Sequence, residues 1–311
     1  MNILVIGTGA VGSFYGSLLA RCGHTVSVVA RSDYETVKQH GIAIASAPLG
    51  DYHFQPSQVV RSGAELAQKP DYVLLCIKVV KGADRIALLK DVLGKHTRIV
   101  LISNGIDIEN EIAEAYPEHE LISGLAFICV TRTEPGKIWH QAYGRLVLGN
   151  YPQGVSDSVR ALCDAYKQAG ISCATSENIT TARWQKCVWN AAFNPISVLA
   201  GGLGTAEILK EQEPLLRSIM REITEIAHAA GHTLAADVID ISIGSTLTMP
   251  TYKTSMLIDF EAGRPMETEA ILGNAVRWGQ RLGVAVPHLE TLYGLMKLRE
   301  RSVEQIDFPS N

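Results

Sequence analysis

Apolar residues follow two different rhythms along this 311-residue chain. Short runs rich in Val, Ile and Leu occur in the first half at residues 3–6, 25–30, 72–77 and 99–102. Runs that are apolar at nearly every position are typical of strands buried on both faces of a parallel sheet. Residues 10–22, between the first two runs, have a helical pattern that ends before Gly23. This order predicts a βαβ unit at the start of the chain.

The pattern changes over residues 119–150, where strand-like stretches surround turn signals at 134–137 and 143–144. These signals predict antiparallel hairpins that close the edge of the sheet. From residue 178 the pattern is helical, and the predicted helices cover residues 178–200, 212–230, 236–246, 266–282 and 288–301. Gly231 and Gly283 stand where helices end, and Pro287 suits a first helical turn.

The predicted fold is therefore α/β, with a Rossmann-type doubly wound sheet domain over residues 1–177 and an all-helical domain over residues 178–311. A chain of this length is long for a single core, which also favours two domains.

Composition excludes several classes of protein. A hydrophobic content of 47% with 19% charged residues indicates a globular protein, and the net charge of −4 offers no basic surface for nucleic acid. Apolar runs are too short to span a membrane, and the first residues do not read as a secretory signal, so a cytoplasmic location is expected. The six cysteines are scattered, and Cys22 with His24 lacks a second ligand pair, so no metal site is predicted.

A glycine-rich loop joins the first predicted strand to the first predicted helix, with the sequence Gly7-Thr8-Gly9-Ala10-Val11-Gly12. In a dinucleotide-binding loop, Gly7 would allow the tight turn and Gly9 would let the backbone approach a pyrophosphate. Gly12 would let helix and strand pack closely, and the helix N-terminus would attract the phosphates. The alternative is a chance cluster of glycines in a turn, against which the strand–loop–helix context argues.

The residue after the second predicted strand distinguishes the two nicotinamide dinucleotides. NAD sites usually carry a carboxylate there for the ribose 2′-hydroxyl, whereas this chain has Arg31. A guanidinium pairs well with a 2′-phosphate, so NADPH is the predicted cofactor. Asp33 follows two residues later and is interpreted as the cap of the next helix.

Polar residues also follow two later strands. Lys78 and Asn104 come at the carboxyl ends of predicted strands, where open parallel sheets bind ligands, so both are expected near the nicotinamide. An ordinary surface lysine and an Asn-Gly turn are the alternatives.

A helix over residues 183–195 is apolar on all sides, which predicts a central position in the second domain. Lys186, Asn190 and Asn194 lie four residues apart and share one stripe of this helix. Burying a lysine and two amides is costly unless they pair or face a polar cavity, so either a ligand-facing stripe or a structural polar network is expected. Pro195 should kink or end the helix nearby.

These blocks resemble the ketopantoate reductase family, the NADPH-dependent 2-dehydropantoate 2-reductases of pantothenate biosynthesis. The resemblance covers nearly the whole chain. It depends on the glycine loop, Lys78, Ser103-Asn104-Gly105, the Lys-Asn-Asn-Pro helix, the block from Ser255 to Gly273 and the segment Gly283–Pro287.

The resemblance implies that Lys186 is the general acid and Glu267 its partner, although a carboxylate at Glu267 would also suit a helix N-terminus for electrostatic reasons alone. It further implies that Asn104, Asn190, Asn194 and Ser255 bind a small 2-oxo acid. The implied reaction is NADPH-dependent reduction of 2-dehydropantoate to (R)-pantoate.

Two alternatives remain open at this stage, a reductase of another branched 2-oxo acid and a non-catalytic NADPH-binding sensor. Ile258, Met266 and Thr268 differ from the residues common in the family. Met266 and Thr268 flank Glu267, so they put the exact substrate in question more than the reaction type. A homodimer is one option for the assembly, which the sequence does not determine.

Overall fold

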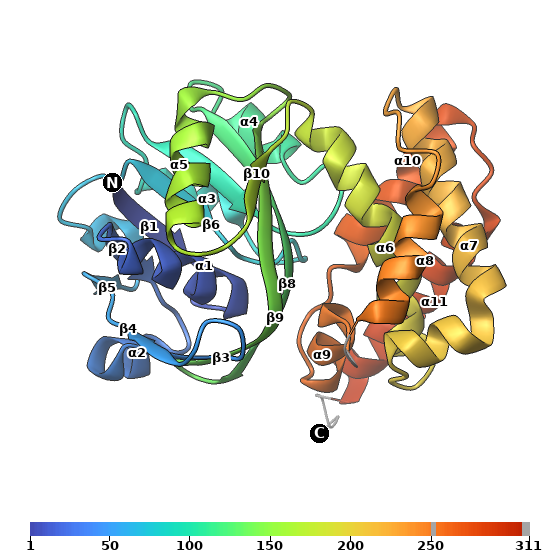
Figure 1. Cartoon of the computed structure of the whole chain (residues 1–311), viewed down its shortest axis with the longest axis horizontal. Coiled ribbons are helices and arrows are strands. Elements are labelled where there is room, and N and C mark those ends of the chain that lie inside the picture. The colour runs from blue at the N-terminus through green and yellow to red at the C-terminus, as the bar shows by residue number, and fades with distance from the viewer. Residues whose placement is uncertain (250–252, 307–311) are drawn as a thin grey trace. The chain divides into compact units, whose positions relative to one another are not determined.

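The computed structural model describes residues 1–249 and 253–306, which form two compact units (Figure 1). The sheet unit consists of Met1–Lys78, Ala83–Ser103 and Ile108–Ile179, and the helical unit of Val79–Gly82, Asn104–Asp107 and Thr180–Asn311. Two short loops from the first half of the chain therefore belong to the helical unit. The domain boundary between residues 177 and 178 stays a prediction.

Within the described residues the sheet unit contains one ten-stranded sheet of order β4-β3-β9-β8-β7-β6-β1-β2-β5, with β10 beside β9. Its strands are β1 (Asn2–Ile6), β2 (Thr25–Val29), β3 (Ile42–Ser46), β4 (Tyr52–Phe54), β5 (Val59–Val60), β6 (Tyr72–Leu75), β7 (Arg98–Ile102), β8 (Leu121–Glu134), β9 (Lys137–Asn150) and β10 (Cys173–Thr175). Its helices are α1 (Ala10–Arg21), α2 (Tyr34–His40), η1 (Gly63–Glu65), α3 (Arg85–Lys90), α4 (Asn110–Ala115) and α5 (Asp157–Gln168).

Helices cover both faces of the parallel part of this sheet. Strands β7, β6, β1, β2 and β5 pair in parallel, as the βαβ pattern predicts. Along β1, Ile3 and Val5 enter the core formed with α1 and α5, whereas Leu4 and Ile6 enter the core formed with α3 and α4. Alternate residues of one strand thus serve two cores, which explains why these strands are apolar at every position.

The antiparallel part of the sheet differs from the prediction in two respects. Only 134–137 contains a hairpin turn, between β8 and β9, whereas Tyr143 and Gly144 form a bulge inside β9 with φ values of 64° and 124°. The hairpin also does not close the sheet, because β3 pairs in parallel with β9 and β4 follows β3. This pairing joins segments distant in sequence, which local turn signals do not reveal.

The helical unit contains helices only, among the residues that are described. They are α6 (Ile179–Leu199), α7 (Thr205–Ala229), α8 (Val238–Thr248), α9 (Ser255–Glu261), the π-helical turn η2 (Glu269–Gly273), α10 (Asn274–Leu282) and α11 (Pro287–Ile306). The predicted class, a Rossmann-type doubly wound sheet followed by a helical region, is confirmed.

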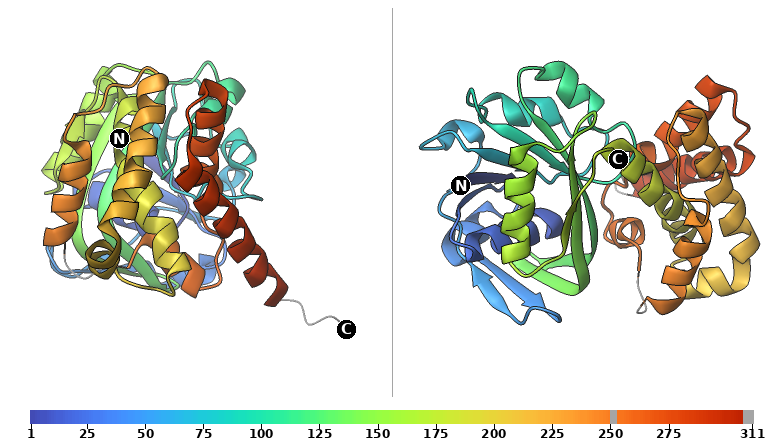
Figure 2. Two further views of the ribbon diagram at one scale, coloured as in Figure 1. Left: turned by 90° about the vertical axis from the view of Figure 1, so that its right-hand side faces the viewer. Right: turned by 45° about the horizontal axis from the view of Figure 1, so that its top comes forward.

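Helix α6 forms the centre of this unit. Its residues Val188, Ala191 and Ala192 are completely buried in the core that all of the longer helices share. The helix continues one turn past Pro195 before it ends. Helix α11 is the last element, and its final turns extend past the neighbouring helices of the unit (Figure 2).

The helix ends follow local signals in most places. Gly283 adopts the left-handed conformation after α10, with φ of 69°, as its predicted capping position requires. Helix α7 starts earlier than predicted, and its backbone is non-helical at Gln212, two residues before Pro214. The predicted helix over residues 266–282 begins with the π-helical turn η2, an irregularity that occurs frequently near functional sites.

Candidate active site

The glycine-rich loop has the geometry that a dinucleotide site requires. Gly7 has φ of +103°, a conformation that favours glycine. A Cβ on Gly12 would lie 2.1 Å from the carbonyl oxygen of Gly7, so helix α1 packs against the loop as only glycine allows. A Cβ on Gly9 would meet nothing within 4 Å, which leaves open space above the backbone at the N-terminus of α1. Helix N-termini with such space suit phosphate groups.

Arg31 lies just after β2 and is exposed, at the carboxyl end of the parallel sheet. Asp33 occupies the predicted N-cap position of α2, but its side chain makes no capping hydrogen bond. Its carboxylate accepts a hydrogen bond from Thr8 Oγ1 instead, at 2.7 Å. The capping interpretation is therefore wrong for the side chain, since a buried partner from the glycine loop replaces the backbone donors.

Lys78 is half-buried and follows the end of β6, in the sheet unit. Its strand ends at Leu75, two residues earlier than predicted.

Asn104 and the three residues after it belong to the helical unit, although they follow β7. Ile106 N–H donates to the carbonyl of Ala270, at 2.9 Å. Gly105 has φ of +109°, and a Cβ on it would lie 2.6 Å from Cβ of Ala270. The Asn-Gly pair is therefore no simple turn, because only glycine permits this approach to η2.

Lys186 and Glu267 are joined through Asn104. Lys186 Nζ donates to Asn104 Oδ1 at 2.9 Å, and Asn104 Nδ2 donates to Glu267 Oε2 at 3.2 Å. The backbone N–H of Val79 donates to the other oxygen of Glu267, at 3.2 Å. Glu267 is only 7% exposed. Three residues predicted for the site thus meet in one hydrogen-bonded chain.

Asn190 and Asn194 continue the stripe that begins at Lys186. Their side chains are buried, at 8% and 2% exposed, and within the described parts of the chain neither amide has a hydrogen-bond partner. Buried amides are usually satisfied, so this stripe fits a surface that binds a polar ligand better than a structural network. Ser255 is half-buried and is the first residue of α9, directly after the capping residue Thr254.

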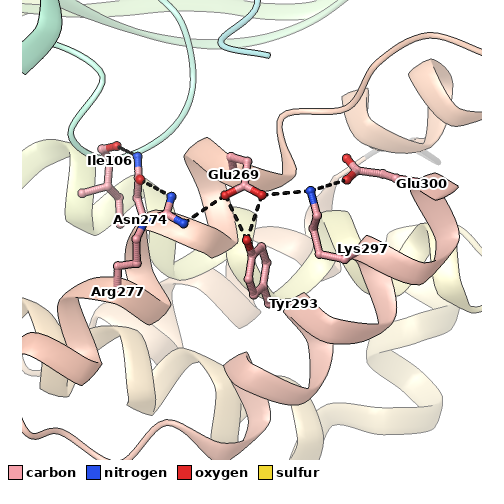
Figure 3. A network of polar contacts seen from close by, with 7 residues as sticks. All are labelled: Ile106, Glu269, Asn274, Arg277, Tyr293, Lys297 and Glu300. Atoms are coloured by element: carbon pink, nitrogen blue, oxygen red, sulfur yellow. Dashed lines mark hydrogen bonds and ion pairs between the residues drawn. The ribbon is translucent and has the colours of Figure 1, made fainter. Parts of the chain in front are cut away.

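The π-helical turn η2 is fixed by a polar network around Glu269 (Figure 3). Glu269 accepts hydrogen bonds from Tyr293 at 2.8 Å, Lys297 at 2.9 Å and Arg277 at 3.0 Å. These residues point toward one carboxylate from α10 and α11 (Figure 3). Burial alone would raise the pKa of Glu269, but the hydrogen bonds from Lys297, Tyr293 and Arg277 hold that pKa below its usual value.

The same network reaches the loop that carries Asn104. Arg277 Nη2 donates to Asn274 Oδ1 at 2.6 Å, and Asn274 Nδ2 donates to the carbonyl of Ile106 at 2.6 Å (Figure 3). A second contact comes from Arg183 at the start of α6, whose Nη1 donates to the carbonyl of Gly105 at 3.2 Å. Sequence analysis missed Arg183, which is 2% exposed, and its place on the same helix as Lys186 was the available signal.

Two cysteines lie close to these residues without being reactive. Burial raises the pKa of Cys187, which follows Lys186, to about 12, and it raises the pKa of Cys76, which packs beside Gly12, to about 12. Both thiols are therefore neutral at ordinary pH. The described residues contain no group of three or more side chains that could hold a metal ion, and no described helix is long and apolar enough to cross a membrane.

Comparisons with known proteins give a consistent result. The family model described as ketopantoate reductase PanE/ApbA matches residues 3–153, and the model of the C-terminal region of ketopantoate reductase PanE/ApbA matches residues 178–300. A curated 2-dehydropantoate 2-reductase from Nostoc sp. is 32% identical over 300 residues, which cover 94% of this chain and 93% of that protein.

Solved structures are also similar. The crystal structure of 2-dehydropantoate 2-reductase from Methylococcus capsulatus is 66% identical, with a TM-score of 0.93, and the match covers 97% of this chain and 98% of that one. A D-mandelate dehydrogenase, solved with NADH and anilino(oxo)acetate, has a TM-score of 0.87 at 22% identity, covering 98% of this chain and 100% of that one. At this identity the second similarity concerns the fold alone.

Proposed function

The chain belongs to the ketopantoate reductase PanE/ApbA family of oxidoreductases, and from this premise we propose that it reduces 2-dehydropantoate to (R)-pantoate with NADPH, a step in pantothenate biosynthesis. The observation that carries the proposal is the hydrogen-bonded chain from Lys186 through Asn104 to Glu267. It supplies a proton donor, a group that orients the donor and a carboxylate that fixes the orientation.

The cofactor would bind at the glycine-rich loop. The open space above Gly9 and the N-terminus of α1 support binding of its pyrophosphate by the backbone of Gly7 to Gly12. Arg31, exposed after β2, would pair with the 2′-phosphate. Lys78 and Asn104, which follow neighbouring strands, would lie near the nicotinamide. The bound dihydronicotinamide supplies a hydride to the ketone carbon.

Lys186 would complete the reduction with a proton. Hydride addition places negative charge on the former ketone oxygen, and an ammonium group within hydrogen-bond reach stabilises and then protonates that oxygen. Asn104 presents its carbonyl oxygen to Lys186 because its amide nitrogen is held by Glu267. Glu267 in turn cannot rotate freely, since Val79 N–H binds its other oxygen. Glu267 therefore acts by fixing the direction of the Lys186 ammonium.

The polar stripe of α6 would hold the substrate. Asn190 and Asn194 have amide groups without partners in the described chain, and Ser255 adds a hydroxyl donor. Such neutral donors suit the carboxylate and hydroxyl groups of a small 2-oxo acid. A cytoplasmic location and a homodimer stay predictions.

A reductase of another branched 2-oxo acid is the second candidate. Met266 and Thr268 flank Glu267, are buried and differ from the residues common in the family, so they could change which acyl side chain fits. Initial rates of NADPH oxidation with a panel of 2-oxo acids discriminate between the candidates. The proposal predicts the highest kcat/KM for 2-dehydropantoate, and a negligible rate with it would refute the proposal. A non-catalytic sensor would oxidise NADPH with no acid of the panel.

A further inference from the structure

A buried carboxylate contacts the glycine-rich loop. Asp33 is 3% exposed, and Thr8 of the loop, 5% exposed, donates its hydroxyl hydrogen to Asp33 Oδ1 at 2.7 Å. The second oxygen, Oδ2, lies 3.3 Å from Nη1 of Arg132 on β8. Both oxygens are thus engaged by elements distant in sequence.

Asp33 lies close to the position at which NAD sites carry a carboxylate. A carboxylate shortly after the second strand is the group with which NAD sites bind the ribose hydroxyls. A carboxylate with free oxygens and full negative charge at Asp33 would attract a ribose hydroxyl and repel a 2′-phosphate. In this chain the hydrogen bond from Thr8 and the charge of Arg132 oppose both effects.

Arg132 supplies the positive charge that neutralises Asp33. The side chain of Asp33 is 2% exposed and that of Arg132 is 32% exposed, so solvent screens this pair incompletely. A buried carboxylate deprived of its cation keeps an uncompensated charge, which is costly and acts over longer distances than a hydrated one. The neighbouring carboxylate of Glu35 differs, because its pair with Arg61 is exposed, with side chains 80% and 55% accessible.

Arg31 is a third charged residue in the segment that follows β2. Its side chain is exposed, and among the described residues it pairs with neither Asp33 nor Glu35. Because Asp33 pairs with Arg132 and Glu35 with Arg61, neither carboxylate offsets the charge of Arg31. The guanidinium of Arg31 can therefore pair with an anionic ligand at the end of β2.

We propose that Arg132 determines the preference for NADPH over NADH by neutralising Asp33, without touching the cofactor itself. This inference rests on the proposed function, which names NADPH as the cofactor. Arg132 is in this account a specificity-determining residue that acts through Asp33, and Arg31 is the residue that meets the 2′-phosphate.

The test is a double-mutant cycle on the full-length protein, with dissociation constants for NADPH and NADH measured by calorimetry. Arg132→Gln should weaken NADPH binding on the order of tenfold and leave NADH binding unchanged or slightly tighter, because Oδ2 of Asp33 is then free for a ribose hydroxyl. Asp33→Asn keeps an acceptor for Thr8 and should bind NADPH at least as tightly as the wild type. The double variant should recover the wild-type preference, because the charge that Arg132 neutralises is gone.

Two further variants separate this effect from a general one. Arg132→Lys keeps the positive charge and should keep the preference. Arg145→Gln removes a positive charge from an exposed position of the same hairpin, where the guanidinium stacks on Phe127, and should leave both dissociation constants unchanged. Thermal unfolding of each variant shows whether the hairpin remains folded.

The outcomes distinguish the inference from the proposed function. If the wild type prefers NADPH but Arg132→Gln keeps that preference, the inference is wrong and the proposed cofactor stands. If the double variant is as weak as Arg132→Gln, Arg132 contacts the phosphate directly, and the role assigned to Asp33 is wrong. A wild type that binds NADH as tightly as NADPH would overturn the proposed cofactor and the inference together.

Discussion

Lys186 Nζ donates a 2.9 Å hydrogen bond to Oδ1 of Asn104, a residue from the loop after β7 of the sheet unit. That loop belongs to the helical unit, where η2, α6 and α10 hold it at Ile106, Gly105 and Asp107. The direction of the lysine therefore depends on how well this loop is fixed, and the predictions for Asn104, Gly105 and Glu269 follow from that dependence.

Replacement of the lysine tests its role as proton donor. Lys186→Ala should lower kcat on the order of 10²- to 10⁴-fold, because general acid catalysis contributes about that factor. Binding of NADPH should change little. Lys210→Ala, at an exposed position of α7, is the matched control and should keep wild-type kcat. Near-full activity of Lys186→Ala would show that another group protonates the product.

Replacement of Asn104 tests the group between the two charged residues. Asn104→Ala removes the acceptor for Lys186 and the donor for Glu267, so kcat should fall roughly 10- to 100-fold. Asn104→Asp would keep an acceptor for Lys186, lose the donor for Glu267 and add a titratable group between them. The pH profile of kcat should therefore change shape in Asn104→Asp. An unaltered kcat in Asn104→Ala would contradict the orienting role.

The backbone at Gly105 should tolerate no side chain. In Gly105→Ala the new Cβ would lie 2.6 Å from Cβ of Ala270 and 2.8 Å from its carbonyl oxygen, at a φ of +109°. The free energy of unfolding should fall by roughly 2–4 kcal/mol, from strain and overpacking together. Gly283→Ala, which has positive φ but open space, should cost only about 1 kcal/mol. Denaturant titrations measure the free energy of unfolding of both variants. An equal decrease in Gly105→Ala and Gly283→Ala would contradict the close packing of Gly105 against Ala270.

The network around Glu269 predicts a dependence of stability on pH. Hydrogen bonds hold the pKa of Glu269 below its ordinary value of 4.5, against the opposing effect of burial. Because the folded-state pKa is lower than the unfolded one, this stabilisation is complete above about pH 4.5 and is lost as the pH falls through the lowered value.

Glu269→Gln removes this contribution. Since the carboxylate is 40% exposed, the loss at neutral pH should be only about 0.5–1 kcal/mol after solvent screening. The stability difference between wild type and variant should shrink as the pH is lowered from 6 toward 3, through the ordinary carboxyl pKa and toward the lowered one. A difference that stays constant over this range would contradict the charged network of Figure 3.

Local sequence patterns are sufficient to predict the strands, the glycine loop and the main polar stripe of this protein. The apolar strands, the glycine loop and the stripe from Lys186 to Asn194 each depend on spacing within one segment, so periodicity revealed them. The predicted position of Asn104 at a strand end was also local, although its membership of the helical unit was not.

The remaining features depend on contacts between distant segments. Strand β3 pairs in parallel with β9, with Ala43 opposite Lys137. Turn signals in the sequence predict hairpins, so they do not predict a parallel pairing of this kind. Asp33 has the sequence context of a helix cap, yet its buried carboxylate contacts Thr8 and Arg132 and makes no capping hydrogen bond. Neither partner is recognisable before the chain is folded.

The proposed reaction is tested most directly by adding 2-dehydropantoate to the protein with NADPH and following both cofactor oxidation and product. We predict that one molecule of (R)-pantoate forms for each NADPH oxidised, and that Lys186→Ala reduces this rate by at least about 100-fold while it still binds NADPH. NADPH oxidation that does not respond to 2-dehydropantoate, or that yields no pantoate, would contradict the account.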